Sequence, residues 1–519
     1  MVSSHRLVIK DGAWQLMGRI ISALFWFVTI KIITPYLGPL RYGDYSTILK
    51  YFAIWTALAD LWLYVLAVKS LGSLKEHEKD PQHTELKQEY GKFVGTRLFI
   101  MSIVYILAIV VAYLLPAYTS NPYLVRWLPF GMIFSASFMY AWIQQLPLQI
   151  FRRMDQLSRS LIVARLSQIA ILIPVVFFIF KDMTFDGTTV SIIAFCCIMF
   201  SVVASSIGQN IQIHISANKL LPLKIQFDRK FTKNIIKRNR QYGVSYYLSS
   251  FHTLIVLLFL GRFFPTSWGH DYSWMWALSL SLIELLLIIP SALGNSLLHK
   301  ISDYSLLEKR KSIGNLLLLM FFIGWIIAVN FWLFADQIIL VISGKEFLGS
   351  FASFTDRWSN QVLPFLWIVL LWSFIKQVYN YLFVAVDKQN VLLPINLIWV
   401  LVGIPLWIRI ISTYWLFGGT ITQLFIEFIF MLGAIRVGRK KHIQPIVSWK
   451  IMRKLLALLL MLSGVGYAIT YFRTITIPWF FIVAIVLNLI IVYISLPVIK
   501  KIAKWLTGAD DLSLSSPIS

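Results

Sequence analysis

Ten ionisable residues lie inside long apolar stretches of the sequence, and these are the residues whose type and position could do chemistry. They are Arg19, Lys31, Lys50, Asp60, Arg97, Arg165, Glu284, Lys376, Arg409 and Glu427. A charge at the depth of a membrane's hydrocarbon core is costly, so such residues by default face a bundle interior or a water-filled cavity and mark transport pathways. They are the first candidates for a transport site.

Three of these residues, Arg19, Arg97 and Arg165, share one depth in the N-terminal half of the chain. Each lies about five to seven residues from the same end of its apolar stretch, which is roughly 7–10 Å at the rise of an α-helix. Snorkelling of the side chain to the membrane surface explains each arginine alone. Three at one depth favour an anion-binding entrance, because the planar guanidinium matches phosphate oxygens and stays charged.

Four of the ten lie deeper, namely Asp60, Glu284, Lys376 and Glu427. Deep acids either pair with basic residues and serve structure, or titrate and take up a coupling ion, and both interpretations stay open. Lys50 lies toward the opposite side of the membrane, where snorkelling is the simpler interpretation, and it is retained as a further cavity candidate. Neutral amides in the same stretches could meet sugar hydroxyls, although hydrogen bonding between helices is the simpler role; they are Gln144, Gln145, Gln168, Asn210 and Asn396.

The elements that must position these residues are membrane-spanning helices. The chain has 519 residues, of which 58% are hydrophobic and only 13% charged, whereas soluble domains carry about a quarter charged residues. Apolar stretches of about 20 residues recur, each long enough to cross ~30 Å of hydrocarbon. We predict an all-α polytopic membrane protein with about fourteen spans, near 13–34, 45–68, 93–116, 125–148, 159–181, 189–213, 241–261, 273–297, 313–334, 358–385, 390–411, 419–437, 451–472 and 477–498.

The basic residues are distributed very unequally between the two sides of these spans. One side carries 33 Lys and Arg, and the other carries seven: Arg41, Arg126, Lys181, Arg262, Lys345, Arg357 and Arg473. Because cytoplasmic segments carry the excess of positive charge, both termini are predicted to be cytoplasmic. The net charge of +24 is then explained by topology and by attraction to anionic lipid headgroups, and a nucleic-acid partner is not expected.

A short segment occurs twice and indicates duplicated halves. Pro39–Ser46 contains Pro, an aromatic residue followed by Gly, and then Asp-Tyr-Ser, and Pro265–Ser273 repeats this order 226 residues later. Two halves of similar hydrophobic content are typical of duplicated transporters. The predicted division is a six-helix lobe over 1–213, a basic connector over 214–240, a second six-helix lobe over 241–437, an additional hairpin over 438–498 and a cytoplasmic tail over 499–519. Residues 227–236 of the connector form either an interfacial amphipathic helix or part of a solvated linker.

Motifs for soluble catalysis are missing from the sequence. There is no Gly-x-x-x-x-Gly-Lys-Ser/Thr motif for ATP and no Asp-x-Asp pair in a soluble domain. The two cysteines, Cys196 and Cys197, are adjacent and offer neither a disulfide framework nor metal-ligand spacing. We therefore predict no catalytic residues, no metal site and no cofactor, and a protein that is not an enzyme.

Several loose motifs together resemble one family. They are Gly18-Arg19-Ile20, the turn Leu37–Ser46, Ala59-Asp60, the segment Phe334–Phe347 and the turn Ala385–Asn390. With these motifs the chain resembles the bacterial polysaccharide and O-antigen flippases of the multidrug/oligosaccharidyl-lipid/polysaccharide exporter superfamily. Two departures exist: Leu61-Trp62-Leu63 lacks the usual glycine after the Asp of span 2, and Gly243-Val244-Ser245 lacks the usual proline of span 7.

The resemblance implies two lobes related by pseudo-two-fold symmetry, facing each other in a V around a central cavity. It implies a polyprenyl-pyrophosphate-linked oligosaccharide as substrate, moved from the inner to the outer leaflet of a bacterial or archaeal cytoplasmic membrane by alternating access. The candidate coupling ions are H⁺ and Na⁺, and other polysaccharide-assembly membrane proteins are candidate partners. On this interpretation Arg19, Arg97 and Arg165 bind the pyrophosphate.

Two alternatives are open. One is a cation-coupled exporter of drugs or small solutes from the same superfamily, for which twelve spans and a mainly acidic cavity would be expected. The other is a membrane polymerase, ligase or glycosyltransferase that acts on polyprenyl-linked sugars. Such an enzyme typically needs a sizeable outer loop, and the longest one predicted here, Ala335–Arg357, is short.

Overall fold

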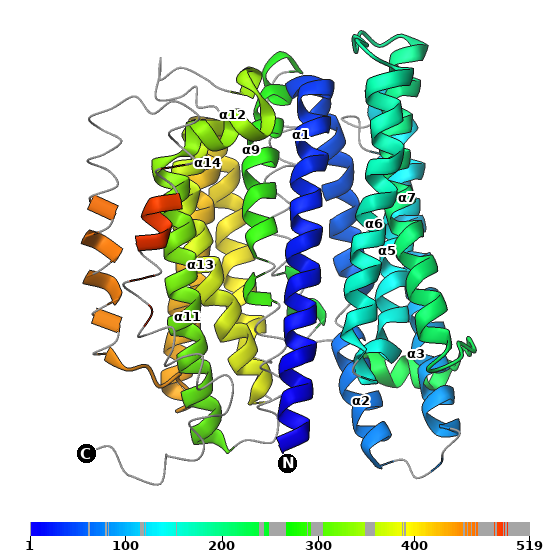
Figure 1. Cartoon of the computed structure of the whole chain (residues 1–519), viewed down its shortest axis with the longest axis vertical. Coiled ribbons are helices and arrows are strands. Elements are labelled where there is room, and N and C mark those ends of the chain that lie inside the picture. Colours follow the sequence, from blue (N-terminus) through cyan, green and yellow to red (C-terminus); the bar gives the residue numbers. More distant parts are fainter. Residues whose placement is uncertain are drawn as a thin grey trace. The chain divides into compact units, whose positions relative to one another are not determined.

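A computed structural model shows that the chain is built from helices. It describes residues 2–60, 63–77, 80, 83–114, 119, 121–151, 153–237, 243–245, 247–248, 266–287, 289–291, 305–347, 359–386, 388 and 391–449, with short runs between 452 and 496. Every regular element within these ranges is helical (Figure 1). The all-α polytopic class predicted from the sequence is confirmed.

Eight helices of the described ranges are long and apolar enough to cross a membrane. They are Met17–Asp60, Thr84–Leu114, Pro122–Ile150, Met154–Ile179, Thr189–Asn218, Leu306–Leu333, Leu392–Ile410 and Gly418–Lys440. The first of these covers two predicted spans. Most of the predicted spans at 241–261, 451–472 and 477–498, and the whole tail 499–519, lie outside the described residues, so the count of fourteen stays a prediction.

The chain divides into two compact units, each described here by itself. The N-terminal unit comprises Trp14–Ala277 and Asn396–Trp415, and the C-terminal unit comprises Met1–Ala13, Leu278–Ile395 and Leu416–Ser519. The N-terminal unit contains α2 (Leu63–His77), α3 (Thr84–Leu114), α5 (Pro122–Ile150), α6 (Met154–Pro174, continued as a π-helix over Val175–Ile179) and α7 (Thr189–Asn218). It also contains most of α1 (Val2–Asp60).

Helix α1 is a hairpin of two spans joined at Gly38. The hydroxyl of Ser158 donates to the carbonyl of Trp14 at 2.6 Å, and that of Tyr36 donates to Phe180 at 2.7 Å, so the first part of α1 runs parallel to α6. Tyr51 donates to the carbonyl of Ala108 at 2.5 Å and Thr56 bonds to Tyr105 at 2.7 Å, so the second part runs antiparallel to α3. Figure 1 shows the blue ribbon folding back accordingly.

Gly38 alone makes this turn. Its backbone lies at φ 66°, ψ 173° and is the one non-helical position inside α1, in a region that is open essentially only to glycine. Pro39 follows at the start of the second span, where its fixed φ suits a helix and its missing N–H costs nothing. The turn expected over Leu37–Ser46 is therefore confined to one residue, and Pro39–Ser46 is already helical.

A polar cluster ties this turn to α5. Asp44 is 1% exposed and accepts from Arg41 at 2.8 Å and from the side-chain amide of Asn121 at 2.8 Å. Asn121 also caps α5 by accepting from the backbone N–H of Tyr123 and Leu124, and the Arg41 guanidinium lies 3.8 Å from the centre of the Tyr123 ring. These bonds pair the charges of Asp44 and Arg41 and give partners to backbone N–H groups at the start of α5. Buried polar groups need such partners.

The C-terminal unit holds the end of α9 (Thr266–Leu286), α11 (Leu306–Leu333), α12 (Ala335–Ser343), α13 (Ser359–Ala385) and most of α14 (Leu392–Lys440). Leu455, Leu459 and Leu487 form one core cluster with Leu318 and Phe322 of α11. The side-chain amides of Asn330 and Asn488 donate to each other's oxygens at 3.0 and 3.1 Å. The described residues of the two C-terminal predicted spans therefore pack on α11.

Candidate functional site

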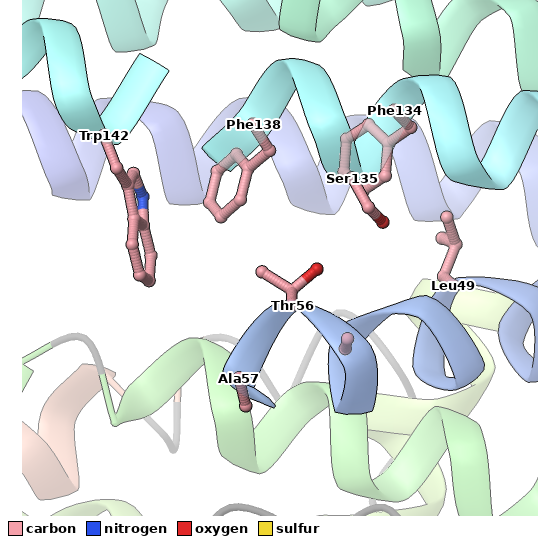
Figure 2. Close-up of a pocket in the computed structure, with 8 residues that line it drawn as sticks. Leu49, Thr56, Ala57, Phe134, Ser135, Phe138 and Trp142 are labelled. Carbon is pink, nitrogen blue, oxygen red and sulfur yellow. The ribbon is translucent and has the colours of Figure 1, made fainter. Parts of the chain in front are cut away.

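The N-terminal unit contains a partly open cavity of about 250 Å³ between the second span of α1 and α5. Figure 2 shows Phe134, Ser135, Phe138 and Trp142 of α5 facing Leu49, Thr56 and Ala57 of α1. Both helices are long and apolar enough to cross a membrane. The cavity is therefore a space within the membrane that is lined mostly by apolar and aromatic side chains, as ligand-binding pockets usually are.

Aromatic rings form a column along one wall of this cavity. Phe134, Phe138 and Trp142 are spaced four residues apart, which places them on one face of α5. The ring centres are 6.0 Å apart for Phe134 and Phe138, and 5.3 Å apart for Phe138 and Trp142. Tyr64 of α2 extends the column, with its ring centre 6.2 Å from that of Trp142, and its hydroxyl donates to the side-chain oxygen of Gln149.

A buried ion pair lies at the end of the column. Arg97 of α3 donates to the carboxylate of Asp60 at the end of α1, and the two residues are 2% and 3% exposed. The Arg97 guanidinium lies 5.8 Å from the Trp142 ring centre and also contacts the Met139 sulfur at 3.6 Å. A buried guanidinium is tolerated only when it is paired, and Asp60 supplies the compensating charge.

Arg97 is not saturated by these contacts. Its Nε has no hydrogen-bond partner among the described residues, although a guanidinium can donate five hydrogen bonds. Next to the cavity, the hydroxyls of Thr56 and Tyr105 bond to each other at 2.7 Å. Arg97 therefore keeps one buried, unused donor at the end of an apolar, aromatic surface, while Asp60 compensates its charge.

The other two arginines of the predicted trio lie on neighbouring helices. Arg19 on α1 is half-buried. Arg165 on α6 donates to Ser22 at 3.4 Å and to Gln168 at 3.0 Å, and Ser22 is one helical turn from Arg19. The structure thus places Arg165 where α6 contacts α1, one helical turn from Arg19.

The C-terminal unit has its own buried ion pair. Lys376 of α13 donates to Glu427 of α14 at 3.0 Å, and Glu427 is 2% exposed. Ser373 and Gln423 also approach the same carboxylate oxygen, at 3.4 and 3.5 Å, and the Lys376 ammonium lies 5.1 Å from the Phe430 ring centre. Two of the deep residues predicted from the sequence are therefore partners.

The remaining candidates are placed as follows. Glu284 is half-buried on α9, and Lys50 is half-buried on α1. Three of the neutral amides join different segments: Gln144 bonds His214 at 3.0 Å, Asn210 donates to the carbonyl of Ser137 at 2.7 Å, and Asn396 donates to Ser245 at 2.9 Å. Among the described residues, no group of three or more His, Cys, Asp or Glu could hold a metal ion.

The sequence interpretation did not single out the aromatic column or Tyr64. The spacing of Phe134, Phe138 and Trp142 at four-residue intervals was the available signal. In an apolar span, however, such a stripe is equally typical of helix packing or lipid contact. Only the cavity in front of the column distinguishes these possibilities.

Comparisons with known proteins agree with this architecture. A family model described as "Polysaccharide biosynthesis protein" matches residues 8–275. The structure is similar to that of the lipid II flippase MurJ in an inward closed conformation, with a TM-score of 0.65 and 14% identity over 95% of this chain and 100% of that one. No match was found among curated protein sequences.

Multidrug exporters share the fold at greater distance. An inward-facing multidrug resistance MATE family transporter of the MOP superfamily matches with a TM-score of 0.56 and 13% identity over 83% of this chain and 99% of that one. The Vibrio cholerae MATE transporter VcmN in its bent form matches with a TM-score of 0.52 and 14% identity over 85% of this chain and 98% of that one. At these identities the likeness shows the fold alone.

Proposed function

Because the chain belongs to the family of polysaccharide biosynthesis proteins, we propose that it is a flippase for polyprenyl-pyrophosphate-linked oligosaccharides. It moves them from the inner to the outer leaflet of the cytoplasmic membrane by alternating access, without catalysing a reaction. The observation that carries this proposal is the Arg97 guanidinium at the end of an aromatic cavity at membrane depth. A pyrophosphate attached to a prenyl chain needs both a fixed positive charge and an apolar surface.

The pyrophosphate docks on Arg19, Arg97 and Arg165. A diphosphate leaves water cheaply only if fixed positive charges replace its hydration, and arginine supplies bidentate donors without a change of protonation. Arg97 is held by Asp60 in the absence of substrate. Substrate binding then exchanges one anionic partner of Arg97 for another, which keeps the guanidinium paired at each step.

The proposed orientation places both termini in the cytoplasm. It follows from the excess of Lys and Arg on one side of the predicted spans and the tendency of basic loops to remain cytoplasmic. With this orientation the arginine trio lies in the inner-leaflet half of the membrane, where polyprenyl-linked precursors are built. Other membrane proteins of polysaccharide assembly are the proposed partners.

The test is flipping of a fluorescent polyprenyl-pyrophosphate oligosaccharide in proteoliposomes. Arg→Ala, Arg→Lys and Arg→Gln variants are made at the three positions and checked for normal insertion. A charge-assisted hydrogen bond contributes about 1.5–3 kcal/mol, so each Ala variant should weaken substrate binding roughly ten- to a hundredfold. Lysine should rescue only in part, because it keeps the charge and loses the planar fork. Nine variants that all flip at the wild-type rate would contradict the docking proposal.

A second candidate function is export of drugs or small solutes coupled to a cation. The fold that the chain shares with MATE transporters favours it, as do the deep acids Asp60, Glu284 and Glu427. The same proteoliposomes distinguish the two candidates. Uptake of cationic dyes driven by a proton or sodium gradient, together with no flipping of the lipid-linked sugar, would support the exporter.

A further inference from the structure

The segment after α7 forms a strap along the start of α3. We define the first strap as residues 222–237, of which 222–228 are extended and 229–237 helical. Asp228 caps the helical part by accepting from the backbone N–H of Lys230 at 2.8 Å and of Phe231 at 3.0 Å. The bond from Phe231, with that from Lys230, lowers the pKa of Asp228, so this acid stays ionised as a cap.

Two glycines of α3 hold the extended part. The backbone N–H of Gln226 donates to the carbonyl of Gly91 at 3.1 Å. A Cβ at Gly91 would lie 2.1 Å from the carbonyl oxygen of Lys224, and one at Gly95 would lie 2.2 Å from that of Gln226. Neither position accepts a side chain unless the strap moves away. We call the surface formed by these two glycines, on which the strap backbone packs, the seat of the strap.

One face of the helical part is packed on α3. The hydroxyls of Thr232 and Thr96 bond at 2.8 Å, and the rings of Phe231 and Phe93 meet edge to face with centres 5.2 Å apart. Ile235, one turn beyond Phe231, is 8% exposed. Residues 222–237 of the connector are therefore docked on α3 and do not form a solvated linker.

The same construction recurs in the C-terminal unit. The second strap, residues 443–448, follows α14, and the N–H of Ile446 donates to the carbonyl of Arg310 at 3.0 Å. A Cβ at Gly314 would lie 2.0 Å from the carbonyl oxygen of Ile446. The carbonyl that accepts the hydrogen bond from the strap belongs to Gly91 in the first unit and to Arg310 in the second. The glycine that contacts the strap, Gly95 or Gly314, lies four residues later in each case. These two glycines are 219 residues apart.

The outer face of the first strap combines cations with apolar side chains. Ile225, Phe227 and Ile236 are 57%, 54% and 38% exposed. They are interleaved with exposed basic residues, namely Lys224, Arg229, Lys230, Lys233 and Lys237. The one acid of the strap is the cap Asp228. A face of this composition suits an anionic membrane interface, in which apolar groups reach the acyl boundary and cations reach the headgroups.

The contact of Phe227 with α3 locates the outer face of the first strap relative to that helix. Its ring centre is 4.9 Å from that of Phe99, and Phe99 begins an exposed apolar stripe of α3 that continues through Ile103 and Ile106. Such a stripe on a spanning helix faces lipid tails. The first strap therefore continues the lipid-facing surface of α3 at the point where tails give way to headgroups.

We propose that the first strap is a binding surface for the anionic phospholipid headgroups of the inner leaflet; the second strap has the equivalent structural position in the C-terminal unit. Trp449, which directly follows the second strap, is 67% exposed, and Lys440 and Lys441 precede that strap at the end of α14. The inference rests on the proposed orientation, and its test does not require transport, so its failure is distinguishable from failure of the flippase function.

The test is photocrosslinking of the full-length protein in phosphatidylcholine vesicles. The vesicles contain a trace of photoactivatable phosphatidylglycerol or of the matching phosphatidylcholine, and adducts on residues 222–237 are mapped by mass spectrometry. The charge variant is Lys230→Gln/Lys233→Gln/Lys237→Gln. The matched control, Lys87→Gln/Arg153→Gln/Arg159→Gln, removes three charges near the same end of α3, α5 and α6. A third variant, Gly95→Leu, displaces the strap and keeps every charge.

The wild type and the control are expected to give the same excess of phosphatidylglycerol adducts. The charge variant should lower that excess by roughly tenfold or more, Gly95→Leu should lower it too, and high salt should reduce it in the wild type. A charge variant that keeps the wild-type ratio overturns the proposal even if Gly95→Leu does not fold. Displacement of the adducts by unlabelled polyprenyl pyrophosphate also overturns it, because the surface would then bind the substrate lipid.

Discussion

At the scale of single residues, the Asp60–Arg97 pair is the most constrained feature of the N-terminal unit. Both side chains are almost fully buried, and burial makes a charge dependent on its partner. Removing one member of a buried pair typically costs about 3–5 kcal/mol, whereas replacing both by apolar residues of similar volume is often nearly neutral. Replacing both residues together can therefore show whether the pair is needed for function separately from its effect on stability.

We expect Arg97→Met and Asp60→Leu to lower the thermal unfolding midpoint more strongly than the double variant Arg97→Met/Asp60→Leu. The double variant should be nearly as stable as the wild type and yet inactive in flipping, because it lacks the guanidinium beside the cavity. Thermal unfolding of the purified proteins in detergent and the proteoliposome assay give the two readouts. A double variant that flips normally would show that the pair is purely structural.

The deep acids Asp60 and Glu284 allow a second prediction. Proton coupling through these groups predicts that Asp60→Asn and Glu284→Gln fold, and that the pH dependence of their transport differs from that of the wild type, because neither amide titrates. The measurement is the initial flipping rate across a series of pH values. Glu427→Gln serves as a comparison from the C-terminal unit, where the carboxylate is held by Lys376. Unchanged profiles in both acid variants would leave these residues a structural role only.

At the scale of elements, the hairpin of α1 depends on a backbone conformation. Gly38 has a positive φ of 66°, and a side chain there costs about 1–3 kcal/mol. We expect Gly38→Ala to lower the unfolding midpoint and the yield of inserted protein. Gly72→Ala is the matched control, since Gly72 lies within α2 and a Cβ there would meet nothing within 4 Å.

The control should stabilise the protein by up to about 1 kcal/mol, because alanine is the better helix former. Melting curves of the two variants beside the wild type check the sign of each change. If Gly38→Ala had the same thermal unfolding midpoint as the wild type, the backbone at position 38 would accept a side chain without strain, and the prediction would be wrong.

At the scale of the whole molecule, the straps supply a second sign of duplication beside the repeated Pro39–Ser46 motif. If spans 1–6 and 7–12 are parallel repeats, Leu40, which is 39% exposed, and Thr266, its counterpart when Pro39 is paired with Pro265, lie near the same membrane surface. We expect single cysteines at these positions, in a background without Cys196 and Cys197, to react with an impermeant maleimide added from outside. Labelling of one from outside and of the other only from inside would exclude parallel repeats.

Much of the architecture is determined by the sequence itself. Apolar length fixes the polytopic helical class, because a backbone in lipid must satisfy its own hydrogen bonds and helices do so within one segment. The cost of charge at membrane depth marks Asp60, Glu284, Lys376 and Glu427 as deep residues that either pair or titrate. Pairing is one of these two alternatives, and the structure pairs Asp60 with Arg97 and Glu427 with Lys376.

Which residues meet was decided only by the tertiary structure. In α3, the exposed Phe99, Ile103 and Ile106 and the buried Ile100 and Val104 are all apolar. A spanning helix is surrounded by lipid tails as apolar as its own core, so its sequence does not show which face packs against a neighbour. The pairing of Arg97 with Asp60, the cavity in front of Trp142 and the seat of the strap on Gly91 each join segments far apart in the chain. Local periodicity cannot specify such contacts, because they arise only when the helices are brought together.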